Sequence, residues 1–395
     1  MGQDVRFIIV HRDDSFAVQM RAMLSQIEGV KIVAEVDEPG LLAQVVKQCP
    51  VDIVLVDLDP SPESILAILA DVLTATPPPV LFAASASTDG PLILKAMRMG
   101  IREFLPKPLE ANALREAIEK VAVQRPESGR TGKLITVMGT AGGVGATTLT
   151  ANLGVELAGL TDRGVTVVDL DYRYGQVATL LDVEPTYTLA DLCASPEQLE
   201  SQVVTRALTK HLTGVQVLSR PSNFVEADGI TAPACVGVLS TLLQMNEHVV
   251  TDGPSRFDSG AQSLLALSDV NLLVVQLLIP CVRNALRILD TLRHTGYNLD
   301  RMRLICNRMG RDSGHLTVEN VSETLNLPVF ATIPDDWGTV SGAINLGEPL
   351  KIYGPKSKVR LAIQEIAERL HTPEEQADDK DARKKGLIGR IFATS

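Results

Sequence analysis

The sequence predicts an α/β fold made of two doubly wound domains. Along most of the chain, apolar runs of strand length alternate with amphipathic helical patterns, the order that builds parallel sheets covered by helices on both faces. A chain of 395 residues exceeds the size of one ordinary core. A polar stretch with Gly and Pro, residues 123–132, separates two such series and is typical of a linker.

Composition and charge describe a soluble globular protein. Hydrophobic residues make up 45% and charged residues 22% of the chain. The net charge of −11 argues against a nucleic-acid partner, which needs a basic surface. No apolar run reaches the roughly 18 residues of a membrane span, and the N-terminus lacks a signal-peptide pattern. The five cysteines lack C-x-x-C spacing, which favours incidental thiols in a reducing cytoplasm over metal ligands or disulfides.

The first predicted domain spans residues 4–122 and the second spans residues 133–370. Apolar runs predict the strands of the first domain at Val5–Val10, Lys31–Glu35, Ile53–Asp57, Val80–Ala84 and Glu103–Leu105, with helices such as Ser15–Ile27 and Gly40–Gln48 between them. The longest apolar run of the chain, Leu272–Ile279, suits a buried parallel strand. The strands predicted in the second domain are Leu134–Met138, Val165–Asp169, Val215–Leu218, His248–Asp252, Asn271–Leu277, Arg303–Asn307 and Val329–Ile333.

A Gly-rich loop, Gly139–Thr148, stands between a predicted strand and a helical pattern, which is the setting of a phosphate-binding loop. Its glycines allow a tight turn whose N–H groups point into a concavity, and the positive end of the following helix adds to the attraction for phosphate. In a standard loop of this kind a lysine precedes the Ser/Thr pair, but Ala146 stands there. A turn that serves packing alone is the alternative. The residues expected to contact phosphate are Gly142, Gly143, Val144, Gly145, Ala146, Thr147 and Thr148.

Further segments follow in an order that resembles the MinD/ParA class of deviant Walker ATPases. They are Asp169-Leu-Asp171 after a strand, the Walker B-like His248–Asp252, Leu304–Arg308, Thr332–Asp336 and Asn345–Leu350. The resemblance implies ATP and Mg²⁺ as cofactors, with Asp171 near the attacking water and Asp252 and Thr147 at the metal. It also implies that Asn307 recognises the adenine base and that Arg308, the next residue, belongs to the nucleotide-binding site. From the residues alone, Asp171 and Asp252 could equally cap helices, and Asn307 could be a turn residue.

The chain departs from that class at two lysines. The signature lysine early in the loop is Ala141, and the second is Ala146. Each lysine contributes a charge-assisted contact of about 1.5–3 kcal/mol, and the transition state of phosphoryl transfer needs a cationic clamp. We therefore predict ATP binding in the micromolar range or weaker, with at most weak ATP hydrolysis. Whether Arg163 or Arg173 replaces the lysines stays open.

The first domain resembles a response-regulator receiver domain, which has a flavodoxin-like fold. Asp57 stands at the phosphoacceptor position, and Lys107 matches the lysine that precedes a proline. The acidic pair that would hold Mg²⁺ is replaced by His11 and Arg12. A hard dication needs several oxygen ligands, so we favour a degenerate site with an Asp57–Lys107 ion pair over phosphotransfer. The domain is then a docking or dimerisation module.

The segments GGVGATT and DLDYRYGQVATLLDVEP, together with the receiver-like domain before them, resemble the TadZ/CpaE family. That resemblance implies a cytoplasmic homodimer in Tad pilus assembly that recruits the pilus secretion machinery, peripherally at the inner membrane or a cell pole. An active ATPase switch that cycles between a bound dimer and a free monomer is the alternative. DNA segregation is disfavoured by the acidic charge, and phosphorylation-driven regulation by His11 and Arg12.

Residues 371–395 form a charged tail with a short apolar end. In Arg383–Phe392, four apolar side chains share one helical face among basic residues, which suits a membrane surface. A partner's groove and an unstructured end are the alternatives. The apolar positions are Leu387, Ile388, Ile391 and Phe392.

Overall fold

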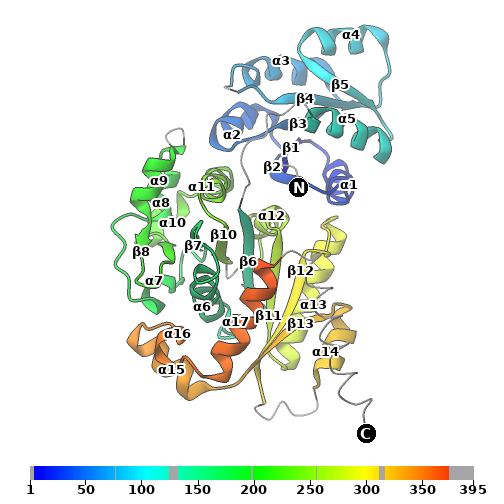
Figure 1. Cartoon of the computed structure of the whole chain (residues 1–395). Coiled ribbons are helices and arrows are strands. Elements are labelled where there is room, and N and C mark those ends of the chain that lie inside the picture. Colours follow the sequence, from blue (N-terminus) through cyan, green and yellow to red (C-terminus); the bar gives the residue numbers. More distant parts are fainter. Residues whose placement is uncertain are drawn as a thin grey trace, which may run out of the picture.

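The computed structural model describes residues 4–75, 77–123, 132–196, 199–254, 256–310 and 316–372, which form two α/β units (Figure 1). We call residues 4–123 the first domain and residues 132–372 the second domain. Nearly all of the predicted linker, and the tail from residue 373 on with its apolar end at 383–392, lie outside the described residues.

The first domain is a parallel sheet in the strand order β2-β1-β3-β4-β5, which is a flavodoxin-like order. Its strands hold continuous apolar runs because helices cover both faces. The elements are β1 (Val5–Val10), α1 (Asp14–Leu24), β2 (Val30–Val36), η1 (Pro39–Leu41), α2 (Leu42–Gln48), β3 (Ile53–Asp57), α3 (Pro62–Val72), β4 (Val80–Ser85), α4 (Gly90–Arg98), β5 (Ile101–Pro106) and α5 (Ala111–Val123).

The second domain is an eight-stranded sheet in the order β13-β12-β11-β6-β10-β7-β9-β8. Its first half contains β6 (Lys133–Gly139), α6 (Ala146–Ala158), β7 (Val165–Asp169), α7 (Val177–Leu180), α8 (Leu189–Cys193), α9 (Ser201–Ala207), β8 (Thr209–Lys210), β9 (Gln216–Leu218) and α10 (Phe224–Asp228). Its second half contains α11 (Ala232–Met245), β10 (His248–Asp252), α12 (Ser259–Leu267), β11 (Val270–Val275), α13 (Ile279–His294), β12 (Met302–Met309), α14 (Val318–Leu325), β13 (Val329–Pro334), α15 (Trp337–Leu346), α16 (Leu350–Tyr353) and α17 (Lys358–His371).

Two expectations about the second sheet need correction. The sheet is mixed, because the edge strand β8 pairs antiparallel with β9. A two-residue strand is too short to show an apolar period, and antiparallel edges are common on sheets of this kind. The apolar run Leu272–Ile279 is also not one strand: β11 ends at Val275, and α13 begins at Ile279 with Pro280 in its first turn. Proline fits there because its missing N–H has no helical partner at that position.

The parallel strands of the second domain place its polar loops at one edge. The carboxyl ends of β12, β11, β6, β10 and β7 lie along the same edge of the sheet, which is where ligands bind in open α/β sheets. Helix α17 packs against α6 and β13 and covers one face of the sheet (Figure 1). Among the helices of the described residues, none has both the length and the apolar character that a bilayer span requires.

Candidate functional site

The Gly-rich loop joins β6 to α6 and turns in a conformation that only glycine adopts easily. Gly143 and Gly145 have φ angles of +75° and +98°. A Cβ added to Gly145 would lie 2.4 Å from Nδ2 of Asn307, which is closer than any side chain tolerates. The loop and the end of β12 are therefore in direct contact at this glycine.

The carbonyl groups of the loop are held by side chains from neighbouring elements. Asn284 Nδ2 donates to Thr140 O at 3.0 Å, Gln276 Nε2 to Gly143 O at 3.2 Å, and Asn307 Nδ2 to Val144 O at 2.7 Å. Within the described part of the chain, the amides of residues 142–148 donate to no acceptor. A run of unpaired N–H groups at the start of a helix is an anion-binding arrangement.

A hydroxyl and a carboxylate meet beside this loop. Thr147 Oγ1 donates to Asp252 Oδ2 at 2.7 Å, and Thr150 Oγ1 donates to Asp252 Oδ1 at 3.2 Å. Burial raises the pKa of Asp252 to about 7, although the two hydroxyl hydrogen bonds act to lower it. A buried carboxylate of this kind is stabilised by a cation, and hydroxyl and carboxylate oxygens are ligands that Mg²⁺ accepts.

A second buried carboxylate, Asp169, lies beside Asp252, and sequence reasoning did not single it out. The two aspartates are register partners at the ends of β7 and β10. Burial, followed by the nearby charge of Asp252, raises the pKa of Asp169 to about 8. Asp169 accepts hydrogen bonds from the amides of Asp171 and Val177 at 3.2 and 3.1 Å, so it holds the loop that carries Asp171.

Asp171 itself lies at the start of that loop, half-buried, and its Oδ1 accepts from the amide of Tyr174 at 3.2 Å. The structure therefore places Asp171 and Asp252 at the same sheet edge as the Gly-rich loop. The available signal for Asp169 was the D-x-D spacing, which contains both carboxylates. Only the strand register shows which of them faces Asp252.

Asn307 and Arg308 border a shallow cavity of about 50 Å³ next to the loop. Arg308 has a left-handed backbone (φ 58°), and its guanidinium carbon lies 5.4 Å from the centre of the Trp337 ring. Pro334 and Asp335 line the cavity too, as do the apolar side chains of Ile333, Val340 and Ile344. Sequence reasoning did not anticipate the part played by Trp337.

Neither arginine considered as a substitute for the missing lysines is directed to the loop. Arg163 precedes β7, at the opposite edge of the sheet, and bonds Glu247 at 2.9 Å. Arg173 pairs with Asp228 of α10. Among the residues that line the cavity, Arg308 is the one with a cationic side chain.

In the first domain, Lys107 contacts both aspartates of the β3 end. Its Nζ lies 2.5 Å from Asp57 Oδ1 and 3.0 Å from Asp59 Oδ2. Asp59 also accepts from Ser85 Oγ at 2.8 Å. The carboxylate at the phosphoacceptor position is thus buried and paired with an ammonium group.

We expect the nucleotide-free protein to lose stability as the pH rises from 6.5 to 8. The folded-state pKa of Asp169, about 8, lies above its ordinary value of 3.8, so the folded state binds more protons than the unfolded state in this window. The free energy of unfolding then falls by up to about 1.4 kcal/mol per pH unit for one such group. Asp252, with a pKa of about 7, acts in the same direction.

Urea unfolding at several pH values checks this expectation. In the control variant Asp169→Asn, the free energy of unfolding should depend less steeply on pH. His248 does not interfere, because burial lowers its pKa to about 4 and its contribution is lost only as the pH falls below about 6.5. Equal slopes in both proteins would show that Asp169 is ionised in the folded state.

Comparison with known proteins gives the class of this site. Residues 135–347, more than half of the 395-residue chain, match the CobQ/CobB/MinD/ParA nucleotide binding domain family, and the chain belongs to that family. It is 26% identical to the septum site-determining protein MinD of Thermotoga maritima over 249 residues, which is 60% of this chain and 88% of that protein.

The solved structure of a MinD protein shows the fold of the second domain. The cell division ATPase MinD of Pyrococcus furiosus is 26% identical and has a TM-score of 0.53, covering 60% of this chain and 98% of its own. A structure described as a CpaE pilus assembly protein from Burkholderia thailandensis is 22% identical with a TM-score of 0.28, covering 30% of this chain and 99% of its own.

Proposed function

We propose that this protein binds ATP with Mg²⁺ at the Gly-rich loop and acts as a nucleotide-dependent scaffold rather than as a fast enzyme. The observation that carries the proposal is the loop itself. Its amides at residues 142–148 have no acceptor in the described part of the chain, while alanine occupies both lysine positions, 141 and 146. Backbone N–H groups are thus the main donors that remain for phosphate oxygens.

The residues present fit a magnesium nucleotide. The amides from Gly142 to Thr148 would hold the phosphates, and Thr147 with Asp252 would hold the metal, which would neutralise phosphate charge. Asn307 and Arg308 border a cavity with an apolar wall, as a planar base requires. Asp171, held by the amide of Tyr174, is the residue we assign to orienting water.

We infer that two copies associate through this edge. Large apolar side chains are exposed around it: Leu278 and Ile279 at the start of α13 are 52% and 59% exposed, and Trp337 at the cavity is 51% exposed. Exposed apolar groups next to a binding site support an interface. A homodimer with nucleotide near its centre is the assembly that this surface supports.

The role in Tad pilus assembly rests on the sequence resemblance to the TadZ/CpaE family. On this proposal the protein is cytoplasmic, recruits pilus secretion proteins to a pole or to the inner membrane, and uses its receiver-like first domain for docking. The Lys107 contact with Asp57 supports docking over phosphotransfer, because the ammonium group is already paired with the carboxylate at the phosphoacceptor position. Membrane contact through residues 383–392 stays a prediction outside the described residues.

The alternative, an active ATPase switch, is separated from the scaffold by phosphate release. With ATP and Mg²⁺ we expect turnover far below about 1 s⁻¹, since no lysine stabilises the phosphate charge in the transition state. Asp171→Ala should leave ATP affinity within about threefold of the parent and abolish any residual release. Turnover of about 1 s⁻¹ or faster that depends on Asp171 would favour the switch.

A further inference from the structure

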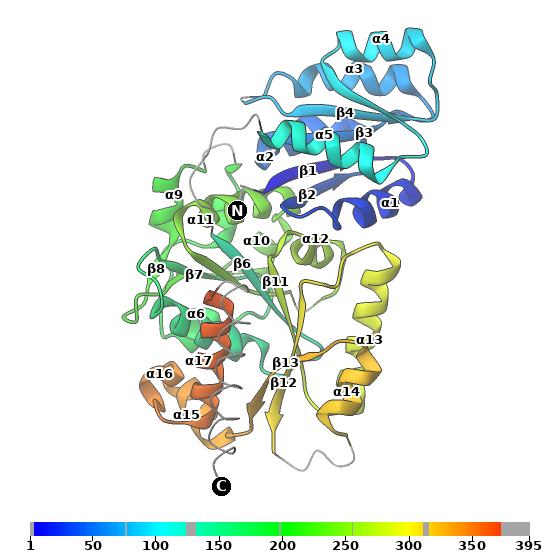
Figure 2. The ribbon, with the colours of Figure 1, turned by 45° about the vertical axis from the view of Figure 1, so that its right-hand side comes forward.

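The two domains share one hydrophobic core instead of lying on a free linker. The edge strand β2 and helix α2 of the first domain pack against α11 and α12 of the second (Figure 2). A single cluster of buried side chains contains Val36, Leu42 and Val46 from the first domain and Leu239 and Leu243 from the second. A contiguous apolar core is a mark of one folding unit.

Glycines of the second domain let the backbones approach each other closely. A Cβ added to Gly237 in α11 would lie 2.4 Å from the carbonyl oxygen of Gln48. A Cβ added to Gly296, which follows α13, would lie 2.6 Å from the carbonyl oxygen of Val18 in α1. At these two positions of the second domain, the first domain therefore lies too close for any side chain to fit.

A buried lysine crosses the boundary between these points. The side chain of Lys31 is 6% exposed, and its Nζ lies 2.8 Å from Asp4 Oδ2 and 2.8 Å from Asp269 Oδ1. The other oxygen of Asp269 accepts from the amide of Leu134 in β6 at 2.7 Å. If the domains moved apart, Lys31 would lose Asp269, and buried charges would be left without a partner. This cost favours the one arrangement of the domains in which the contact forms.

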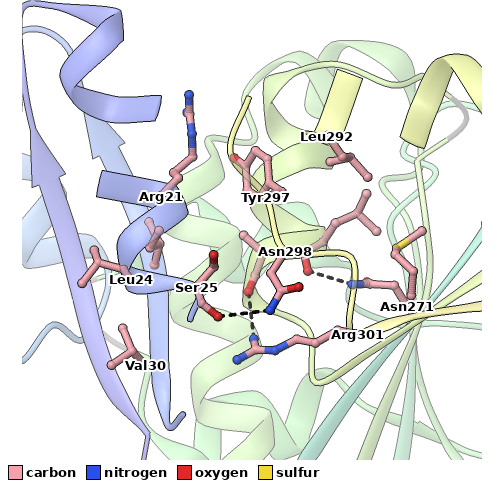
Figure 3. Close-up of a pocket in the computed structure, with 13 residues that line it drawn as sticks. Arg21, Leu24, Ser25, Val30, Asn271, Leu292, Tyr297, Asn298 and Arg301 are labelled. Carbon is pink, nitrogen blue, oxygen red and sulfur yellow. Dashed lines mark hydrogen bonds between the residues drawn. The ribbon is translucent and has the colours of Figure 1, made fainter. Parts of the chain in front are cut away.

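Polar contacts complete the boundary at α1 (Figure 3). Arg21 donates to the carbonyl of Thr295 at 2.7 Å and lies over the ring of Tyr297, and Asn298 donates to the carbonyl of Ser25 at 3.3 Å. The space left between these residues measures about 40 Å³.

We propose that the second domain carries a dedicated docking surface whose partner is the first domain of the same chain, and that the two form one rigid body. Lys31 and Asp4 lie at the amino ends of β2 and β1, and Asp269 immediately precedes β11. The amino edge of the second sheet therefore faces strand β2 of the first domain (Figure 2). The Gly-rich loop lies at the carboxyl edge of the second sheet, so the first domain leaves the nucleotide site open.

Gly237→Ala in the full chain tests the docking surface by the sign of its effect. Alanine is the better helix former, so in a helix exposed to solvent this change raises Tm. Against the carbonyl of Gln48 we expect instead that Tm falls by about 3 °C or more. Gly90→Ala, where the added Cβ meets nothing within 4 Å, is the matched control and should not lower Tm.

Lys31→Met tests the ionic contact, with Lys95→Met as the control, because Lys95 forms an exposed pair with Glu63. We expect amide exchange in residues 30–36 and 259–267 to become at least about tenfold faster, and the radius of gyration in solution to increase. If Lys31→Met does not fold, amide exchange is measured in Gly237→Ala instead, where the same two segments should exchange faster. A higher Tm for Gly237→Ala together with unchanged exchange in that variant would overturn the proposal.

Discussion

Gly145→Ala is expected to remove nearly all nucleotide binding. The φ of +98° costs an alanine about 1–2 kcal/mol, and the new Cβ would lie 2.4 Å from Asn307 Nδ2. Relief of that contact displaces either the loop or Asn307, so phosphate and base contacts are lost together. We expect affinity for a fluorescent ATP analogue to fall by about 100-fold or more, which is a loss of about 3 kcal/mol.

Gly142→Ala is the matched control in the same loop. Its Cβ meets nothing within 4 Å, so we expect a loss at least about ten times smaller. Circular dichroism separates a binding defect from unfolding. Wild-type affinity in Gly145→Ala would show that the nucleotide does not use this loop.

Ala146→Lys is expected to have the opposite effect. Ala146 is the first residue of α6 and is half-buried next to the loop amides, so a lysine there restores the position of the missing cation. A charge-assisted contact of about 1.5–3 kcal/mol corresponds to a gain in ATP affinity of about 10- to 150-fold. The gain should shrink with added salt because the contact is ionic.

Ala146→Met separates charge from side-chain length, because it adds a chain of comparable bulk without the ammonium group. We expect Met to give no gain in affinity. Equal ATP affinity for the lysine and methionine variants would mean that another cation already contacts the phosphates. The proposal that main-chain amides bind the phosphates without a cationic side chain would then be wrong.

The strands that bring the site together could be predicted well from the sequence. Predicted and observed bounds coincide for Val165–Asp169 and His248–Asp252, because a strand buried on both faces is a continuous apolar run ended by a polar residue. The order of these strands in the sheet places Asp252 and the loop at one edge. The prediction failed where the pattern gives no boundary: Leu277 and Ile279 are as apolar as β11 but lie beyond its end.

Features that depend on distant partners had no local signal. Asp169 is distinguished from Asp171 only by its register with Asp252. Lys31 and Gly237 look like an ordinary strand lysine and a weak helix position, because their partners Asp269 and Gln48 lie far away in the chain. The linker prediction marked a boundary in sequence, but the apolar core continues across it.

Isothermal titration of the intact protein with Mg²⁺ and ATP tests the central claim most directly. We predict one ATP per chain with a dissociation constant in the micromolar range or weaker, and an affinity at least about 100-fold lower for Gly145→Ala. Absence of binding at millimolar ATP, or the same isotherm for both proteins, would contradict the account that main-chain amides without a lysine hold the nucleotide.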